Sequence, residues 1–351
     1  MKIAITADNH LRTREEHPAR WLAFENILSQ LDAEKIRHLI IAGDLYDKEY
    51  DNYSEFDQLI NGSSLEKCYI IPGNHDPGIR QSQFGSDKIQ VFTETTPMPF
   101  EEGEGSFVFV PYIIGKSMGT EIASAPNLEP GKWVLIGHGD YIDGRHEPNP
   151  YEKGIYMPLS RKDIGARQPA KAILGHIHIP SDLSGKVVYT GSPCGLDINE
   201  TGRRRYLIFD TLTYGLTEKA IDTDVLFCQG EVFVFPGEKE EEGLQKEIDA
   251  LIEKWDLKEE EFEKAQIRVK ITGITSDKNK LAENVKKYFE KFKWHKDEGP
   301  DLDNVAAPSE SEDMALAEQT LNRIKEMELP QELHGISRMD IQNAALKLLI
   351  K

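Results

Sequence analysis

Short apolar runs alternate with polar stretches along the first part of the chain, and five of the runs end in similar polar side chains. Apolar runs of four to eight residues bounded by turn residues predict buried strands. The runs and the residues that follow them are Lys2 to Ala7 before Asp8-Asn9-His10, His38 to Ala42 before Gly43-Asp44, Cys68 to Pro72 before Gly73-Asn74-His75-Asp76, Trp133 to Ile136 before Gly137-His138, and Ala172 to Leu174 before Gly175-His176-Ile177-His178. Because open α/β folds place ligands beyond the carboxyl ends of their strands, we expect these polar side chains to meet at one edge of a sheet.

A helix is predicted between the first two runs. Pro18 is suited to the first helical position, and apolar residues then recur at helical spacing. They are Trp21, Phe24, Ile27, Leu28 and Leu31. A strand, a helix and a second strand form a β-α-β unit, which predicts a parallel sheet with a right-handed crossover.

The residue types at the strand ends predict a metal site. Asp8 and Asp44 offer carboxylate oxygens and Asn74 an amide oxygen, while the imidazole nitrogens come from His10, His138, His176 and His178. A mixed oxygen and nitrogen set without thiolate suits Mn, Fe, Zn or Mg. Seven ligands are too many for one ion but suit two ions about 3.5–4 Å apart, the arrangement used for displacement at phosphorus. Asp44 is the simplest bridging ligand.

These motifs resemble those of the calcineurin-like metallophosphoesterase superfamily over about the first 220 residues. Within it, Ala42-Gly43-Asp44-Leu45-Tyr46-Asp47 and Tyr189-Thr190-Gly191-Ser192-Pro193 resemble the SbcD-type DNA-repair exonuclease subunits. The resemblance implies an αββα sandwich domain, a C-terminal α+β capping-type domain and a short helical tail. It also implies two divalent metal ions, for which we expect Mn²⁺, a homodimer, and an SMC-like coiled-coil ATPase (SbcC-type) as partner.

The histidine that follows Asn74 is interpreted as the catalytic group. Since Asn74 takes the ligand position, His75 can face the leaving oxygen as general acid, and the resemblance implies the same role. Asp76 would orient His75 or cap the next turn. Candidate substrate-binding residues are Arg145, Arg203 and Arg204. Arg145 lies in the long segment 139–165, which is either a lid over the site or a solvated excursion.

Two positions depart from the family pattern. Asp47 stands where many phosphoesterases carry a histidine, and His138-Gly139-Asp140 stands where the nuclease branch often has His-Gln. Both departures concern the substrate geometry, and neither changes the predicted ligands.

The pattern changes after residue 224, so we expect the metallophosphoesterase domain at 1–224 and the capping-type domain at 225–296. An acidic, Gly- and Pro-containing stretch at 297–312 predicts a flexible linker. Residues 313–351 predict two short amphipathic helices, with Ser337 to Asp340 as a cap signal for the second. Helices this short are marginal alone and would dock on this chain's own body or, as we favour, on the ATPase partner.

Composition limits the class of protein. The 351 residues are 39% hydrophobic, enough for a large core. No apolar stretch approaches the roughly 20 residues that span a membrane, and the pattern at the N-terminus predicts a strand and not a signal peptide. Three scattered cysteines, Cys68, Cys194 and Cys228, indicate a reducing cytoplasm. The net charge of −19 is unusual for a protein that binds DNA phosphates.

Three functions therefore stay open. The first is a Mn-dependent exonuclease or endonuclease subunit that acts on DNA ends in double-strand break repair. The second, favoured by the acidity and by Gly139-Asp140, is a phosphatase or cyclic-nucleotide phosphodiesterase of the same superfamily. The third is a catalytically idle metal-binding scaffold, against which the complete ligand set argues.

Overall fold

The chain folds into two compact units. A computed structural model describes residues 1–47, 53–125, 128–144, 154–183, 185–236 and 240–306, with scattered positions from 316 to 348. The first unit comprises Met1–Leu196 and Arg203–Val225, and the second comprises Asp197–Gly202 and Leu226–Lys351. The change of unit after Val225 lies next to the boundary expected at 224, but no local pattern indicated that residues 197–202 belong to the second unit.

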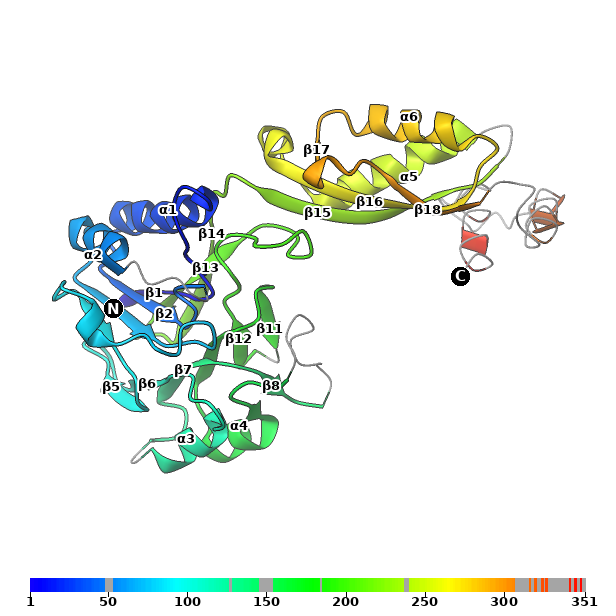
Figure 1. Ribbon diagram of the computed structural model, residues 1–351. Coiled ribbons are helices and arrows are strands. Elements are labelled where there is room, and N and C mark those ends of the chain that lie inside the picture. Colours follow the sequence, from blue (N-terminus) through cyan, green and yellow to red (C-terminus); the bar gives the residue numbers. More distant parts are fainter. Residues whose placement is uncertain are drawn as a thin grey trace. The chain divides into compact units, whose positions relative to one another are not determined.

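Two six-stranded mixed sheets form the centre of the first unit (Figure 1). Across the first sheet the strands are β14 (Gly215–Ala220), β13 (Arg205–Asp210), β1 (Lys2–Thr6), β2 (His38–Ala42), β3 (Lys67–Ile71) and β4 (Ile89–Val91). Across the second they are β11 (Ser181–Leu183), β12 (Val187–Tyr189), β10 (Lys171–Gly175), β7 (Trp133–His138), β6 (Ser106–Val110) and β5 (Thr96–Pro99). In the first sheet, β1, β2, β3 and β4 are adjacent and parallel to one another. In the second sheet, β12, β10, β7 and β6 are adjacent and parallel to one another.

The helices cover the outer faces of the two sheets. Helix α1 (Pro18–Glu34) begins at the predicted proline, and all five apolar residues of its predicted stripe are buried. It ends where Lys35 adopts a left-handed φ of 57°. The others are α2 (Tyr53–Gly62), α3 (Met118–Ser124) and α4 (Arg161–Arg167), with the short 3₁₀ helix η1 (Gln81–Gln83). The predicted β-α-β unit is confirmed, since β1 and β2 pair in parallel around α1.

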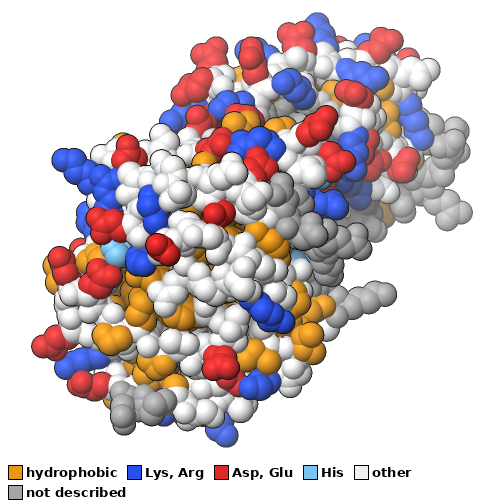
Figure 2. Space-filling view, turned by 60° about the vertical axis from the view of Figure 1, so that its left-hand side comes forward, with side chains coloured by type: hydrophobic (Ala, Val, Ile, Leu, Met, Phe, Trp, Pro, Cys, Tyr) orange, Lys and Arg blue, Asp and Glu red, His pale blue; other side chains and the backbone are white. Residues whose placement is uncertain are grey.

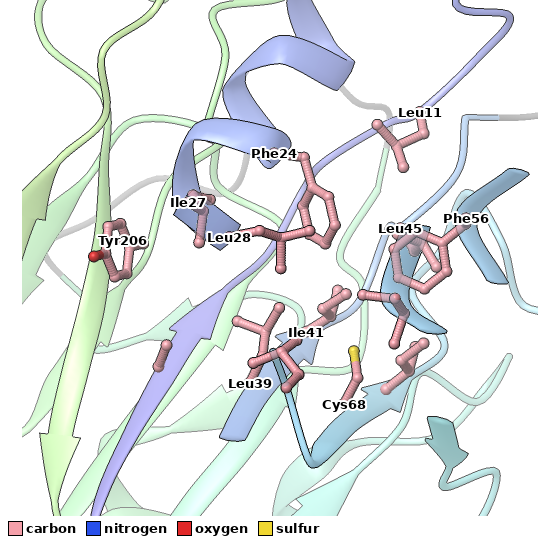
Figure 3. Close-up of a cluster of buried hydrophobic side chains, with 14 of the residues drawn as sticks. Leu11, Phe24, Ile27, Leu28, Leu39, Ile41, Leu45, Phe56, Cys68 and Tyr206 are labelled. Atoms are coloured by element: carbon pink, nitrogen blue, oxygen red, sulfur yellow. The ribbon is translucent and has the colours of Figure 1, made fainter. Parts of the chain in front are cut away.

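Three apolar layers hold the first unit together. One lies between the first sheet and helices α1 and α2, where Phe24, Ile41 and Phe56 pack in the cluster of Figure 3. The second, with Ile40, Phe109 and Ile173 among its members, joins residues of both sheets. The third packs the second sheet against α3 and α4. Complete burial of one such aliphatic or phenyl side chain contributes about 1.5–3 kcal/mol. The layers form the expected αββα sandwich.

The second unit is a smaller α/β structure. Its strands β15 (Leu226–Val234), β16 (Ala265–Ile274), β17 (Lys293–Trp294) and β18 (Asp301–Ala306) are parallel, with β16 paired to each of the others. Helices α5 (Glu240–Trp255) and α6 (Lys278–Tyr288) lie on the same side of the sheet (Figure 1). Their apolar residues pack with alternate residues of β15 and β16 in one core. Two 3₁₀ helices, η2 (Glu259–Lys264) and η3 (His295–Asp297), complete the unit.

Strand β18 corrects part of the predicted linker at 297–312. Residues 301–306 pair with β16, and Val305 is buried in the core of the second unit. The prediction was wrong here because it counted few large apolar side chains, whereas backbone hydrogen bonds and one or two apolar residues are enough to add a strand. Residues 307–312 and most of the predicted helical segment 313–351 lie outside the described residues.

The long segment after His138 is also more regular than expected. Strands β8 (Tyr141–Ile142) and β9 (Leu159–Ser160) pair in parallel, and helix α4 begins at Arg161. Residues 145–153, which would form the lid or excursion, lie outside the described residues. Among the described helices, none has the length and apolar character needed to cross a membrane.

Candidate metal centre

The polar motifs follow the carboxyl ends of five parallel strands. Strands β1, β2 and β3 deliver three motifs from the first sheet, and β7 and β10 deliver two from the second. The registers match: Ala42 pairs with Ile71 in the first sheet, and His138 with Gly175 in the second. Since residues of both sheets share one apolar layer, the two carboxyl edges lie together and the motifs converge.

One group of predicted ligands surrounds the amide oxygen of Asn74. This oxygen lies 2.8 Å from Nε2 of His138 and 3.0 Å from Nδ1 of His176. Nε2 of His138 is also 3.2 Å from Oδ2 of Asp44. One cation could therefore be held by Asp44, Asn74, His138 and His176.

A second group lies beside the first. Asp8, His10 and His178 place ligand atoms within 4.8 Å of one another, and the Nε2 atoms of the two histidines are 3.0 Å apart. Nε2 of His10 is 3.6 Å from the same Oδ2 of Asp44. The structure thus brings all seven predicted ligands together, with Asp44 between the two groups.

The backbone at these positions is strained. Asp8, His10, Asp44 and His176 have φ values of 54°, 46°, 49° and 95°, a region that residues other than glycine rarely adopt. Strain of this kind clusters at functional sites, where the surrounding structure enforces it. Hydrogen bonds between motifs do so here, because Asp8 N donates to Gly43 O and His10 N donates to Asp44 O.

Glycines allow the motifs to approach closely. A Cβ on Gly73 would collide with the Asp44 carboxylate, and a Cβ on Gly43 would collide with the ring of His138. The carboxylates are then held by backbone N–H groups of other motifs. Oδ1 of Asp44 accepts from His75 N at 2.8 Å, and Oδ1 of Asp8 accepts from His176 N at 2.8 Å.

The buried carboxylates of the site favour a positive charge beside them. Burial lowers the pKa of His10 to about 3, so its imidazole is neutral and keeps a lone pair. Burial also raises the pKa of Asp8. At Asp44 burial acts in the same direction, but the charge and hydrogen bond of His138 outweigh it and hold the pKa well below its usual range. Two buried carboxylates side by side are costly unless a cation compensates them.

The residues therefore fit a pair of divalent cations. Oδ2 of Asp8 is buried and has no hydrogen-bond partner among the described residues, as expected of an oxygen reserved for a metal. The donors are carboxylate, amide and imidazole groups, which suit Mn, Fe, Zn or Mg. The ring nitrogens of His75 lie near enough to His10 and Asp44 to make His75 a further possible ligand by distance alone.

His75 lies at the rim of the site. Its side chain is 18% exposed, and its Nδ1 lies 3.2 Å from Oδ1 of Asp47. The other oxygen of Asp47 lies 3.3 Å from a guanidinium nitrogen of Arg20. Asp76 does not hold His75: its Oδ1 accepts from Gly73 N and its Oδ2 from Tyr46 N, so it caps the turn and ties it to the second motif.

The predicted substrate-binding arginines differ in their surroundings. Arg145 lies outside the described residues. Arg203 is half-buried. Arg204 is only 1% exposed, and its Nη1 donates to the carbonyl of His178 at 2.8 Å. A substrate contact does not fit this burial, so the prediction for Arg204 is corrected: it supports the backbone of a candidate ligand.

Sequence reasoning missed three residues that contact the site. Asp47 and Asp140 were noticed only as departures from the family pattern, although Asp47 contacts His75 and Asp140 contacts His176. Arg20, whose guanidinium also donates to the carbonyl of His10, carried no signal, because an arginine in the first turn of a helix is ordinary. Its position follows from where α1 packs.

Comparison with known proteins places the chain in a family. The family model described as calcineurin-like phosphoesterase matches residues 1–209. Similar solved structures include an archaeal phosphodiesterase, with 16% identity and a TM-score of 0.35 over 63% of this chain and 100% of that chain. Another is a hypothetical protein from Thermus thermophilus, with 12% identity and a TM-score of 0.36 over 63% of this chain and 98% of that chain. No curated protein matches the chain. Because the family match spans more than half of the chain and contains all seven candidate ligands, the chain belongs to the calcineurin-like phosphoesterase family.

Proposed function

We propose that the protein hydrolyses phosphodiesters, and that it is a nuclease subunit acting on DNA ends. The observation that carries the proposal is the convergence of seven ligand residues into two groups that share Asp44. A site for two ions suits in-line displacement at phosphorus better than a site for one.

The two groups give each cation a separate set of ligands. Asp8, His10 and His178 would hold one, and Asn74, His138 and His176 the other, with Asp44 between them. Two divalent cations, for which we propose Mn²⁺, would supply Lewis-acid stabilisation of the phosphate charge and a nucleophile at neutral pH. The ligands must keep their positions, and backbone hydrogen bonds hold the carboxylates of Asp8 and Asp44 in place.

His75 is proposed as the general acid. Its Nδ1 lies 3.2 Å from the carboxylate of Asp47, and we propose that Nε2 gives a proton to the leaving oxygen as the phosphorus–oxygen bond breaks. A neighbouring carboxylate orients an imidazole and stabilises its protonated form. Arg20, on the other side of Asp47, fixes the carboxylate in turn.

A DNA substrate is supported by the SbcD-type motifs and by the second unit. A phosphatase for small molecules has no need of a separate α/β unit and a further helical segment. Against this stands the net charge of −19, and basic and acidic side chains are mixed on the face shown in Figure 2. We therefore propose that an SMC-like ATPase, bound through residues 313–351, supplies much of the affinity for DNA. The proposal includes a homodimer in the cytoplasm, where the three buried cysteines stay reduced.

The test is hydrolysis of a linear DNA duplex with and without Mn²⁺. We expect degradation that needs Mn²⁺ and that is abolished in Asn74→Ala, which lacks a ligand, but retained in Asn61→Ala at the end of α2. Degradation by the Asn74→Ala protein at the wild-type rate, or no degradation by the wild type in Mn²⁺, would contradict the proposal.

The second candidate is a phosphatase or cyclic-nucleotide phosphodiesterase. It is favoured by the acidity of the chain and by His138-Gly139-Asp140, which stands where the nuclease branch often has His-Gln. Turnover of bis-p-nitrophenyl phosphate or a cyclic nucleotide without cleavage of DNA, also after addition of an SMC-like ATPase, would decide for this candidate.

A further inference from the structure

Asp140 is a buried carboxylate outside the predicted ligand set. It follows His138 by two residues, and its side chain is 2% exposed. Its Oδ2 accepts a hydrogen bond from Tyr156 N at 2.6 Å, and its Oδ1 lies 3.5 Å from Nε2 of His176. A carboxylate this deeply buried is costly unless its oxygens serve donors or cations nearby.

The ring of His176 lies between Asn74 and Asp140. Nδ1 faces the amide oxygen of Asn74 at 3.0 Å, and Nε2 faces the carboxylate. A neutral imidazole has one N–H and one lone pair. A carboxylate beside Nε2 favours the proton on that nitrogen, which leaves the lone pair of Nδ1 directed at the other ligands. Histidines that bind metals are commonly oriented in this way by a second group.

The backbone around Asp140 is held on several sides. Its N–H donates to Tyr156 O and its carbonyl accepts from Leu159 N, both at 2.8 Å. Gly139, at a φ of 148°, has no room for a Cβ against Tyr156. The hydroxyl of Tyr189 donates to Gly139 O at 3.0 Å and accepts from Tyr141 N at 2.7 Å. Asp140 is thus held in place by the backbone of Tyr156, and it contacts the candidate ligand His176.

We propose that Asp140 is a positioning residue for His176. It keeps the proton of His176 on Nε2, so that Nδ1 can bind the cation shared with Asn74 and His138, and it does not contact the substrate. This inference rests on the proposed two-cation site. Because His176 belongs to only one ligand group, losing Asp140 should weaken one of the two ions and spare the other.

The decisive variant is Asp140→Asn. An asparagine has the same shape, and its carbonyl can still accept from Tyr156 N, but its NH₂ group then faces Nε2 of His176. That donor favours the opposite tautomer, with the proton on Nδ1, where it blocks the metal. A purely structural cap for Tyr156 would tolerate the change. The matched control is Asp163→Asn, because Asp163 accepts from Ser160 N at 2.9 Å in the cap of α4 and touches no candidate ligand in the described contacts.

The experiment measures binding of Co²⁺ alone to the full chain, by equilibrium dialysis with metal analysis and by the visible absorption spectrum of the bound ion. We expect two ions per wild-type chain. In Asp140→Asn one ion should bind about 10–100-fold more weakly, with an altered spectrum, while the second ion and the thermal midpoint in chelator stay as in Asp163→Asn.

Three other outcomes would contradict either the role of Asp140 or the proposed two-cation site. Two ions bound to Asp140→Asn with wild-type affinities would overturn the role of Asp140 and leave the proposed function intact. Equal weakening of both ions, together with a lower thermal midpoint than Asp163→Asn, would show that Asp140 acts only on the fold. A wild-type chain that binds fewer than two ions would overturn the proposed function and this inference together.

Discussion

Oδ1 of Asp47 lies 3.2 Å from Nδ1 of His75, at the rim of a site in which six of the seven predicted ligands are buried. The same carboxylate contacts Arg20 on α1. The contact gives a role to a residue that departs from the common family pattern. It also engages one ring nitrogen of His75 with a residue outside the set of seven predicted ligands.

Replacing His75 should slow turnover and spare metal binding. We expect His75→Asn to lower kcat about 10²–10⁴-fold, the usual contribution of a general acid, with two metal ions still bound per chain. Metal analysis beside steady-state kinetics on bis-p-nitrophenyl phosphate checks this. Loss of an ion from the variant would instead make His75 a ligand, as its distance from His10 and Asp44 also allows.

Asp47 should act through His75 and not beside it. Asp47→Asn keeps the shape of the side chain but weakens the hold on the ring, and we expect kcat to fall less than in His75→Asn. Residues that act as one unit are strongly non-additive. The double variant should therefore be no slower than His75→Asn alone, and additive losses in that double-mutant cycle would refute the dependence.

Gly73 should tolerate no side chain, although a glycine a few residues away should. A Cβ at Gly73 would collide with the Asp44 carboxylate, whereas a Cβ at Gly78 would meet no atom within 4 Å. We expect Gly73→Ala to weaken the binding of both cations, because Asp44 lies between the two ligand groups. Gly78→Ala should bind metal as the wild type does. Titration with Mn²⁺ followed by calorimetry distinguishes them, and equal affinities in both variants would contradict the arrangement.

Removing divalent cations should destabilise the first unit. Asp8 and Asp44 are buried carboxylates with the oxygen Oδ2 of Asp8 unpaired among the described residues. A cation at a concentration of about 100 times its Kd stabilises the folded state by about 2.7 kcal/mol per site. Scanning calorimetry should show a higher Tm in Mn²⁺ than in EDTA, with a smaller difference for Asp8→Asn. Identical Tm values in the two conditions would exclude tight binding.

Replacing Arg204 should destabilise the protein more than replacing its neighbour Arg203. Arg204 is buried and donates to the carbonyl of His178. Its removal deletes the hydrogen bond of a charged group to this carbonyl, which also accepts from Ser192 N, and such a bond contributes about 1.5–3 kcal/mol. We expect Arg204→Ala to lower the free energy of unfolding in urea by that amount and Arg203→Ala, at a half-buried position, to lower it less. A raised KM with unchanged stability in Arg204→Ala would restore the substrate contact first expected there.

Local pattern was sufficient to predict the first helix and the five strands that carry the polar motifs, and it indicated the seven candidate ligands. Each ligand lies at or shortly after the end of its strand, so neighbouring residues alone define its place at the sheet edge. The partners of Asp47 and Asp140 could not be read in this way, because His75 and His176 reach them from other strands. Such contacts depend on how the chain closes in space.

Two errors have a similar cause. Composition suggested a linker at 301–306, but pairing with β16 depends on backbone groups that every residue carries. A basic run suggested phosphate contacts at Arg204, but alternate residues along an extended chain point in opposite directions, and this one points inward. The local residue types do not indicate that residues 301–306 pair with β16, nor that the side chain of Arg204 points inward.

The left-handed backbone at Asp8, His10, Asp44 and His176 sets a limit on how far this protein can be made heat-resistant. Each such position costs of order 1–3 kcal/mol, so glycine at any of them would relax the chain, and it would also delete a side chain of the metal centre. Selection for thermal endurance and selection for catalysis therefore favour different residues at the same four places. A laboratory evolution experiment that screens only for survival after heating in EDTA, where bound cations add no stability, should accumulate inactive but more stable variants with changes at these positions.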